Sequence, residues 1–181
     1  MRVDFLQASR LRPARVLGAL LLTATLGLGA MPASAAAQPV QPLRVGDMPQ
    51  IRASLKGRPM LMHVWSLTCA PCLLEMPLWA ERIRQHPEVA FVFVNTDGLR
   101  HAAAAERRLA GYGVRPARSL IFADDFVERL QYDIAPDWVG ELPRTEWNPP
   151  RQKTIVSLGP VSDALFQQWM AGARKGAPAA P

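Results

Sequence analysis

Residues 63–77 read HVWSLTCAPCLLEMP and hold both cysteines of this 181-residue chain. An apolar stretch leads into Cys69-Ala70-Pro71-Cys72, and a segment compatible with a helix follows. Two thiols separated by two residues, at a junction between a strand and a helix, are typical of a thiol/disulfide redox centre. A thiol at a helix N-terminus faces unpaired backbone N–H groups and the positive end of the helix dipole, which favours the thiolate.

The two cysteines have different expected roles. Cys69 stands at the expected start of the helix and would be the activated nucleophile. Cys72, one turn further into the helix, would be more buried and would resolve a mixed disulfide formed on Cys69. Pro71 suits the first helical turn, where its missing N–H costs nothing.

Other interpretations of the cysteine pair stay open. Half of a zinc site would need further Cys or His ligands, and the sequence offers no other cysteine and three scattered histidines, His63, His86 and His101. A purely structural disulfide is the second alternative, although so short a loop constrains the unfolded chain little. For His63, inside the apolar stretch, a packed or hydrogen-bonded role is favoured over a catalytic one.

The first 37 residues read as a signal peptide. A basic start is followed by the apolar stretch 16–28 and by small residues that offer cleavage near Ala35 or Ala37. An uncleaved membrane anchor is the alternative, but the apolar stretch is shorter than the roughly 20 residues that span a membrane. Export to the periplasm would place the chain where disulfides form.

The charge of the chain argues against a nucleic-acid partner. The formal net charge is +6, and the leader contributes +3 of it through four Arg and one Asp. The remaining +3 is weak and scattered, whereas nucleic-acid binding proteins concentrate positive charge on one surface.

The apolar pattern of the rest of the chain predicts alternating strands and helices. Strands are expected at 60–65, 89–94, 119–122, 144–147 and 153–158, and helices at 73–85, 99–110, 124–132 and 162–173. Residues 38–48 are expected to form an extended lead-in, and residues 176–181 a disordered tail. Strand–helix–strand alternation favours parallel strands joined by right-handed crossovers, and the last two strands suit an antiparallel hairpin.

This order of elements resembles the thioredoxin fold. More narrowly, residues 69–77, CAPCLLEMP, resemble the C-x-P-C-x-x-E-x-P signature of exported TlpA/ResA-type thiol:disulfide oxidoreductases, and the resemblance covers about residues 42–173. It implies an α/β thioredoxin-like domain over residues 38–175, with a central mixed sheet flanked by helices. A small insertion between the two central strands would correspond to residues 119–132.

The resemblance assigns catalytic roles to Cys69, Cys72 and Glu75. Cys69 matches the exposed nucleophile of the family and Cys72 its resolving thiol. Glu75 matches a carboxylate that helps to move protons around the dithiol. The alternative for Glu75 is a solvent-facing acid in the first helical turn, where it would favour the helix dipole.

The resemblance also implies a substrate-binding surface. Leu142 and Pro143 match the cis-proline loop of the fold, where the residue before the proline presents backbone groups to an extended substrate, and we assign Trp65 to the same surface. The family usually has Trp before the first cysteine, but this chain has Thr68. Residues 144–147 also differ from the small hydroxylated and apolar residues expected there, so the resemblance does not define the substrate.

The function implied by the resemblance is a periplasmic thiol:disulfide oxidoreductase that reduces substrate proteins. It would need no bound cofactor, because the Cys69–Cys72 dithiol carries the electrons, and a membrane or soluble thiol donor would reload it. One alternative is a Cu(I)-binding metallochaperone, with Met76 or His63 as a third ligand. The other is a non-catalytic thioredoxin-like domain that binds a partner while its disulfide stays inert.

Overall fold

Strands and helices alternate along the chain in the computed structural model, which describes residues 39–55 and 57–176. In order they are β1 (Gln41–Leu43), α1 (Asp47–Ser54), β2 (Met60–Trp65), α2 (Ala70–Gln85), β3 (Ala90–Asn95), the 3-10 helix η1 (Leu99–His101), α3 (Ala102–Gly111), β4 (Arg118–Phe122), α4 (Val127–Ile134), β5 (Arg144–Asn148), β6 (Ile155–Leu158) and α5 (Asp163–Gly176). Every strand and helix that the sequence predicts from residue 60 onward is present.

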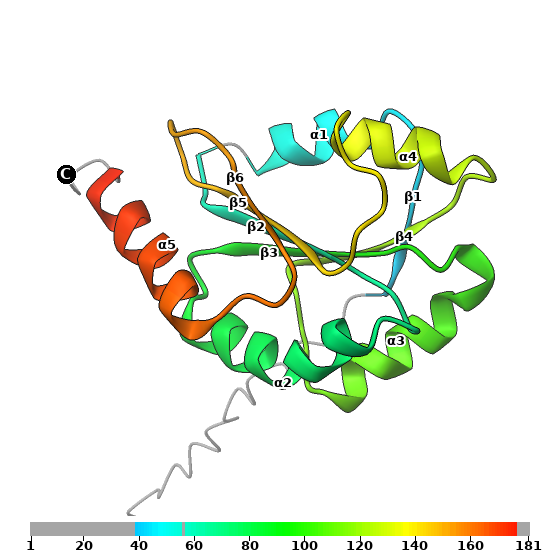
Figure 1. Cartoon of the computed structure of the whole chain (residues 1–181), viewed down its shortest axis with the longest axis horizontal. Helices are drawn as coiled ribbons and strands as arrows, with labels where there is room; N and C mark the ends of the chain where they lie inside the picture. The colour runs from blue at the N-terminus through cyan, green and yellow to red at the C-terminus, as the bar shows by residue number, and fades with distance from the viewer. Residues whose placement is uncertain (1–38, 56, 177–181) are drawn as a thin grey trace, which may run out of the picture. The chain divides into compact units, whose positions relative to one another are not determined.

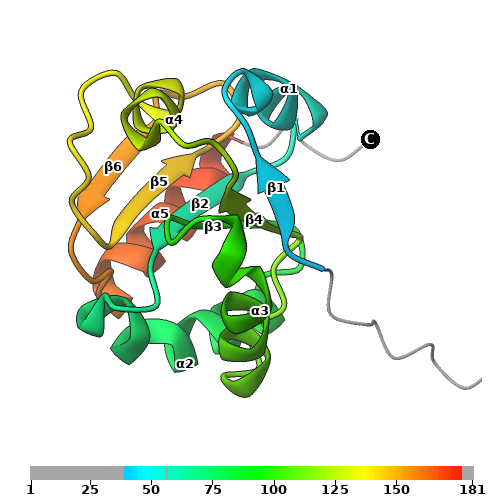
Figure 2. The same ribbon diagram turned by 90° about the vertical axis from the view of Figure 1, so that its right-hand side faces the viewer.

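The six strands of the described residues form one mixed sheet in the order β1-β4-β3-β2-β5-β6. The first four strands in this order run parallel, whereas β5 is antiparallel to both β2 and β6. Figure 2 shows β1 and β6 at opposite edges of the sheet. The predicted α/β architecture is confirmed, and the segment predicted as an insertion forms β4 and α4.

Helices cover both faces of the sheet. In Figure 1, α1 and α4 lie on one face, and α2, α3 and α5 lie on the other. All residues of β2 and β3 are buried between these layers, which explains their nearly continuous apolar sequences. On the α2 side, the Trp79 ring packs edge-on against Phe93 and Phe166, with centroids 6.2 Å apart in both pairs.

The N-terminal lead-in is more regular than the sequence predicts. Residues 41–43 pair with β4 as a parallel edge strand, and α1 starts at Asp47, inside the stretch that was expected to be extended. β1 has three residues, of which only Leu43 is buried, so it carries no alternating pattern to detect. Its conformation comes from the hydrogen-bonded ladder with β4, which is a tertiary contact.

Two sequence predictions lie outside the described residues. They are the signal peptide over residues 1–37 and residues 177–181 of the predicted disordered tail, whose first residue, Gly176, is instead the last residue of α5. Within the part of the chain that the structure describes, no helix combines the length and apolar character needed to cross a membrane.

A buried ion network fixes the strand that follows the proline loop. The Arg144 guanidinium donates to Glu146 Oε1 through Nε and Nη2, at 3.2 and 3.1 Å, and Arg52 Nη2 donates to Glu146 Oε2 at 2.8 Å. Arg52 also donates to the Ile134 carbonyl, so the network joins α1, α4 and β5. Arg144 and Glu146 differ from the small hydroxylated and apolar residues expected after the proline, and the structure places them as a buried pair.

Removing the central carboxylate should strongly destabilise the protein. Glu146→Ala leaves the buried Arg144 charge without its partner, and breaking a buried pair in this way costs about 3–5 kcal/mol. The matched control is Glu81→Ala, which removes an exposed partner of Arg84 and should change the free energy of unfolding by about 0.5 kcal/mol or less. Urea denaturation of both oxidised variants measures the difference. Similar small effects in both would contradict this account.

Candidate active site

The two cysteines lie where β2 passes into α2. Cys69 is the N-cap of α2, with an extended backbone at φ −80° and ψ 94°. Its Sγ accepts a hydrogen bond from the Cys72 backbone N–H at 3.2 Å, in the place of the oxygen that usually caps a helix. The two residues form a disulfide with Cα atoms 5.3 Å apart, so the structure represents the oxidised form.

The two sulfur-bearing residues differ in exposure in the way the sequence predicts. Cys69 is partly exposed, whereas Cys72 is fully buried. No acidic side chain is present in the first turn of α2. The positive end of the helix dipole at Cys69 is therefore not offset by a carboxylate within that turn. A partner that approaches from solvent therefore meets Cys69 before Cys72.

Glu75 lies buried in the second turn of α2, with 3% of its surface exposed. Its Oε2 accepts a hydrogen bond from the Val161 N–H at 3.1 Å, and its Oε1 lies 3.4 Å from His63 Nε2. Burial raises the pKa of Glu75 to about 7, although hydrogen bonding from Val161 and from the Trp79 side chain and the Arg82 charge act in the opposite direction. The alternative of a solvent-facing first-turn acid is therefore wrong, and the carboxyl exchanges its proton near neutral pH.

His63 is a fully buried residue of the central strand β2. Its Nδ1 lies 3.0 Å from Thr145 Oγ1 of β5, and its ring packs against Trp79 and Phe93 at centroid distances of 4.9 and 5.1 Å. Burial, helped by the Arg82 charge, lowers the pKa of His63 to about 3, so the imidazole is neutral at physiological pH. The prediction of a packed, hydrogen-bonded residue is confirmed.

Arg82 supplies a buried positive charge on the same side of the sheet. Its Nη2 donates to the Val161 carbonyl and to Asp163 Oδ1, both at 2.8 Å, so it ties α2 to the start of α5. The guanidinium carbon lies 4.6 Å from the centroid of the Trp79 ring and 4.7 Å from that of Phe166. The sequence does not single out Arg82, because one charged side chain in an amphipathic helix ordinarily faces solvent.

The proline loop lies beside the dithiol end of β2. The Leu142–Pro143 peptide bond is cis, which confirms the expectation from the resemblance. Pro143 is buried, and Leu142 is partly buried and packs against the hydrophobic clusters on both faces of the sheet. The Gly159 N–H donates to the Pro143 carbonyl at 2.8 Å, and Val64 of β2 pairs with Arg144, the first residue of β5.

The position of Trp65 corrects one part of the substrate-surface prediction. Its side chain is fully buried and belongs to the same hydrophobic cluster as Cys72, so it has no surface to offer a substrate. Strand alternation explains the error, because the last residue of a strand buried on both faces points into a core. Thr68, at the position where the family usually has Trp, is exposed, and its hydroxyl lies 3.3 Å from Ser66 Oγ.

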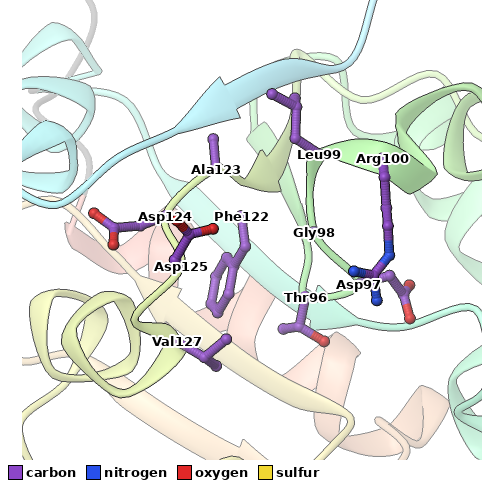
Figure 3. A pocket seen from close by; sticks show the side chains of 10 residues that line it. All are labelled: Thr96, Asp97, Gly98, Leu99, Arg100, Phe122, Ala123, Asp124, Asp125 and Val127. Carbon is purple, nitrogen blue, oxygen red and sulfur yellow. The ribbon is translucent and has the colours of Figure 1, made fainter.

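A pocket of about 380 Å³ lies at the carboxyl ends of β3 and β4 (Figure 3). Its wall includes Asp97, whose Oδ2 accepts hydrogen bonds from the Leu67 N–H and from Asn95 Nδ2, each at 2.7 Å. Leu67 belongs to the loop that leads to Cys69, so Asp97 braces the active-site loop from the neighbouring strand end. This role was not predicted from the sequence, where an Asn and an Asp at the end of a strand indicate only a turn.

The potential third ligands for Cu(I) are already engaged in the core. Met76 and His63 are both fully buried, and the two ring nitrogens of His63 face Thr145 and Glu75. Across residues 39–55 and 57–176, no group of three His, Cys, Asp or Glu side chains is placed to hold a metal ion.

Comparisons with known proteins identify the fold. The sequence matches no protein-family model and no curated protein. Among solved structures, dsbF of MTB aligns with a TM-score of 0.53 and 23% identity, over 66% of this chain and 84% of that protein. A secreted Mycobacterium tuberculosis disulfide oxidoreductase homologous to E. coli DsbE gives a TM-score of 0.53 and 19% identity, over 66% and 85%.

A third solved structure has the same architecture. It is a thiol:disulfide interchange protein of the thioredoxin family from Chlorobium tepidum, with a TM-score of 0.54 and 18% identity, over 67% of this chain and 83% of that one. At such identities the likeness establishes the fold, and this chain therefore has a thioredoxin-like fold.

The buried carboxyl should make stability depend on pH. In the folded protein Glu75 keeps its proton up to a pKa of about 7, whereas the unfolded chain releases it near 4.5. The unfolded state therefore binds fewer protons between these values, and stability falls as the pH rises, by up to about 3 kcal/mol. Glu75→Gln, which has no proton to lose, should escape this loss.

The test is urea denaturation of the oxidised wild type and the Glu75→Gln variant from about pH 4 to about pH 8. The contribution of His63 is common to both proteins and cancels in the difference. The advantage of the variant should grow with pH between the two pKa values, and a difference that is constant over the range would contradict the assigned burial of the charge.

Proposed function

We propose that this protein is a periplasmic thiol:disulfide oxidoreductase that reduces disulfides of substrate proteins. The observation that carries the proposal is one arrangement on α2: a partly exposed Cys69 at the helix N-terminus, a buried Cys72, and a buried Glu75 one turn later. The solved proteins of the same fold are named as disulfide oxidoreductases and thiol:disulfide interchange proteins, which supports the same chemistry here.

The reaction starts from the reduced dithiol. The Cys69 thiolate, favoured by the N-terminus of α2, attacks one sulfur of a substrate disulfide. The substrate S–S bond breaks, one substrate sulfur leaves and takes up a proton, and the other remains bonded to Cys69. The partly exposed Leu142, which precedes the cis proline, would offer backbone and apolar surface to the bound substrate.

The second step releases the substrate. Cys72 gives its thiol proton to the Glu75 carboxylate, and the resulting thiolate attacks Cys69 Sγ. The bond between Cys69 and the substrate breaks, and the second substrate sulfur leaves and is protonated. Two electrons have then passed to the substrate, and the protein holds the Cys69–Cys72 disulfide seen in the structure. A base whose pKa is about 7 suits this transfer at neutral pH.

The proposal extends to the compartment and to the redox partners. A periplasmic location would keep the chain among proteins whose disulfides persist, and one solved protein of this fold is named as secreted. A thiol donor, either soluble or in the membrane, would reduce Cys69–Cys72 after each turnover. The dithiol itself carries the electrons, so the reaction needs no bound cofactor.

Two alternative functions make different predictions for the cysteines. A Cu(I) chaperone would bind the ion through the two thiolates and would need a third soft ligand from the core. A non-catalytic binding domain would keep an inert disulfide. The partial exposure of Cys69 and the buried Glu75 carboxyl, one helical turn after Cys72 on α2, favour the oxidoreductase over both.

The experiment that tests the proposal is the equilibrium reduction potential of Cys69–Cys72, followed by alkylation in glutathione or dithiothreitol buffers. A potential close to the thioredoxin value of about −270 mV supports a reductant, and one near about −120 mV would reverse the direction of electron flow. The absence of a reversible couple would exclude the oxidoreductase.

A trapping experiment tests the two cysteine roles. Cys72→Ser retains the nucleophile but lacks the resolving thiol, so it should accumulate a mixed disulfide with a disulfide-containing peptide. Cys69→Ser is the matched control and should trap little, because Cys72 is fully buried. Non-reducing gel electrophoresis measures the adduct. Equal trapping by both variants would show that the roles are not divided as proposed.

A further inference from the structure

His63 connects the buried carboxyl to the strand that follows the proline loop. Its Nε2 lies 3.4 Å from Glu75 Oε1, and its Nδ1 lies 3.0 Å from Thr145 Oγ1. His63 Nε2 and Glu75 Oε1 are both buried and, among the described residues, make no hydrogen bond that meets the usual geometric limits. The indole N–H of Trp79, also buried without such a partner, is the other side-chain donor that acts on Glu75. His63 Nε2 and Glu75 Oε1 can satisfy one another only if exactly one proton lies between them.

The other oxygen of Glu75 fixes where that proton sits. Oε2 accepts the hydrogen bond from the Val161 N–H at 3.1 Å, so a proton on Oε2 would oppose this donor. The acid form of Glu75 therefore carries its proton on Oε1, and His63 Nε2 must accept it. Because His63 is neutral, its own proton is then on Nδ1 and is donated to Thr145 Oγ1.

The carboxylate form requires the opposite arrangement. Once Oε1 has lost its proton it can only accept, so His63 must carry its proton on Nε2 and donate it to Oε1. Nδ1 then accepts a hydrogen bond from the Thr145 hydroxyl, which can rotate to donate. The His63 ring carries one proton in both states. The two states of the His63–Glu75 pair therefore differ only by the proton of Glu75.

We propose that His63 is the positioning residue for the Glu75 carboxyl and holds it by a hydrogen bond in both protonation states. His63 does so by carrying its proton on Nδ1 in one state and on Nε2 in the other, while the Thr145 hydroxyl accepts from Nδ1 or donates to it. The inference rests on the proposed function, because the carboxyl matters to catalysis as the base for Cys72. It assigns a role in the reaction to His63 of β2 and to the Thr145 hydroxyl of β5, both of which would act through Glu75.

Few other ionisable groups face this pair. On α2, Arg82 acts on both members and is itself paired with Asp163 of α5, and the Cys69–Cys72 disulfide does not titrate in the oxidised protein. The segment before α5 supplies the Val161 amide, and β5 supplies the uncharged Thr145. Oxidised protein therefore reports the Glu75 proton without interference from the thiols.

Three substitutions distinguish the roles of the two ring nitrogens of His63. In His63→Gln the side-chain amide reaches about as far as Nε2, so it can still face Glu75, whereas in His63→Asn it reaches only about as far as Nδ1. The His63→Asn variant thus removes the donor to the carboxylate and should raise the pKa of Glu75 by about one. The His63→Gln variant keeps a donor there, so its pKa of Glu75 should stay close to that of the wild type. Thr145→Val leaves Nδ1–H without an acceptor, favours the Nε2–H form, and should lower the pKa of Glu75 by about one.

The test is carbon-13 NMR of the Glu75 carboxyl and nitrogen-15 NMR of the His63 ring, recorded against pH on the oxidised protein, with Glu75→Gln for assignment. We expect His63 to change from Nδ1–H to Nε2–H at the midpoint of the Glu75 titration, and the Asn and Val variants to move that midpoint in opposite directions. A tautomer independent of pH, or equal shifts in the Asn and Gln variants, would overturn the proposal.

A second readout connects the pair to the reaction. The rate at which Cys72 resolves a mixed disulfide should have a pH midpoint that moves in the same direction as the NMR midpoint in each variant. If the pH midpoint of this rate is the same in the variants as in the wild type, the positioning role is overturned. Neither readout depends on the reduction potential, so failure of this inference is distinguishable from failure of the proposed function, which would appear in the wild type as the lack of a reversible couple.

Discussion

The central strand β2 is the constraint on which the site depends. It is hydrogen-bonded to β3 on one side and to β5 on the other, and it is buried along its whole length. Its end determines where α2 and Cys69 begin, its middle places His63 against Thr145, and its pairing with β5 sets Arg144 opposite Val64. The disulfide, the imidazole and the proline loop are therefore positioned by one element, and a change of its register would separate all three.

Burial is the largest of the effects that set the pKa of Glu75. The Val161 hydrogen bond and the Arg82 charge both favour the Glu75 carboxylate, yet the pKa of Glu75 rises from 4.5 to about 7. That difference corresponds to about 3 kcal/mol in favour of the neutral acid. Arg82 has limited influence because its guanidinium is shared with Asp163 and with two aromatic rings, although it also helps to keep His63 neutral.

Sequence reasoning recovered the features that have local signals. The cysteine spacing and the continuous apolar strands predicted the junction and the alternating strands and helices. The resemblance to the thioredoxin fold supplied the prediction of the cis Leu142–Pro143 bond. Sequence reasoning failed where a conformation depends on a distant partner. β1 exists because of β4, and the contact between His63 and Glu75 joins a strand to a helix. A polar residue inside an apolar strand was the available signal, but nothing in the sequence indicated its partner.

The two buried groups have pKa values in an unusual order, and this order directs the proton of Glu75. A carboxyl with a pKa of about 7 beside an imidazole with a pKa of about 3 forms a neutral pair and not an ion pair. Moving the proton from Glu75 to His63 would create a charge on a fully buried imidazole, which burial and the Arg82 charge both disfavour, so the imidazole stays neutral. Val161 offers only a donor. The exchangeable proton of Glu75 therefore passes to the dithiol or to solvent, which is the property that a base for Cys72 requires.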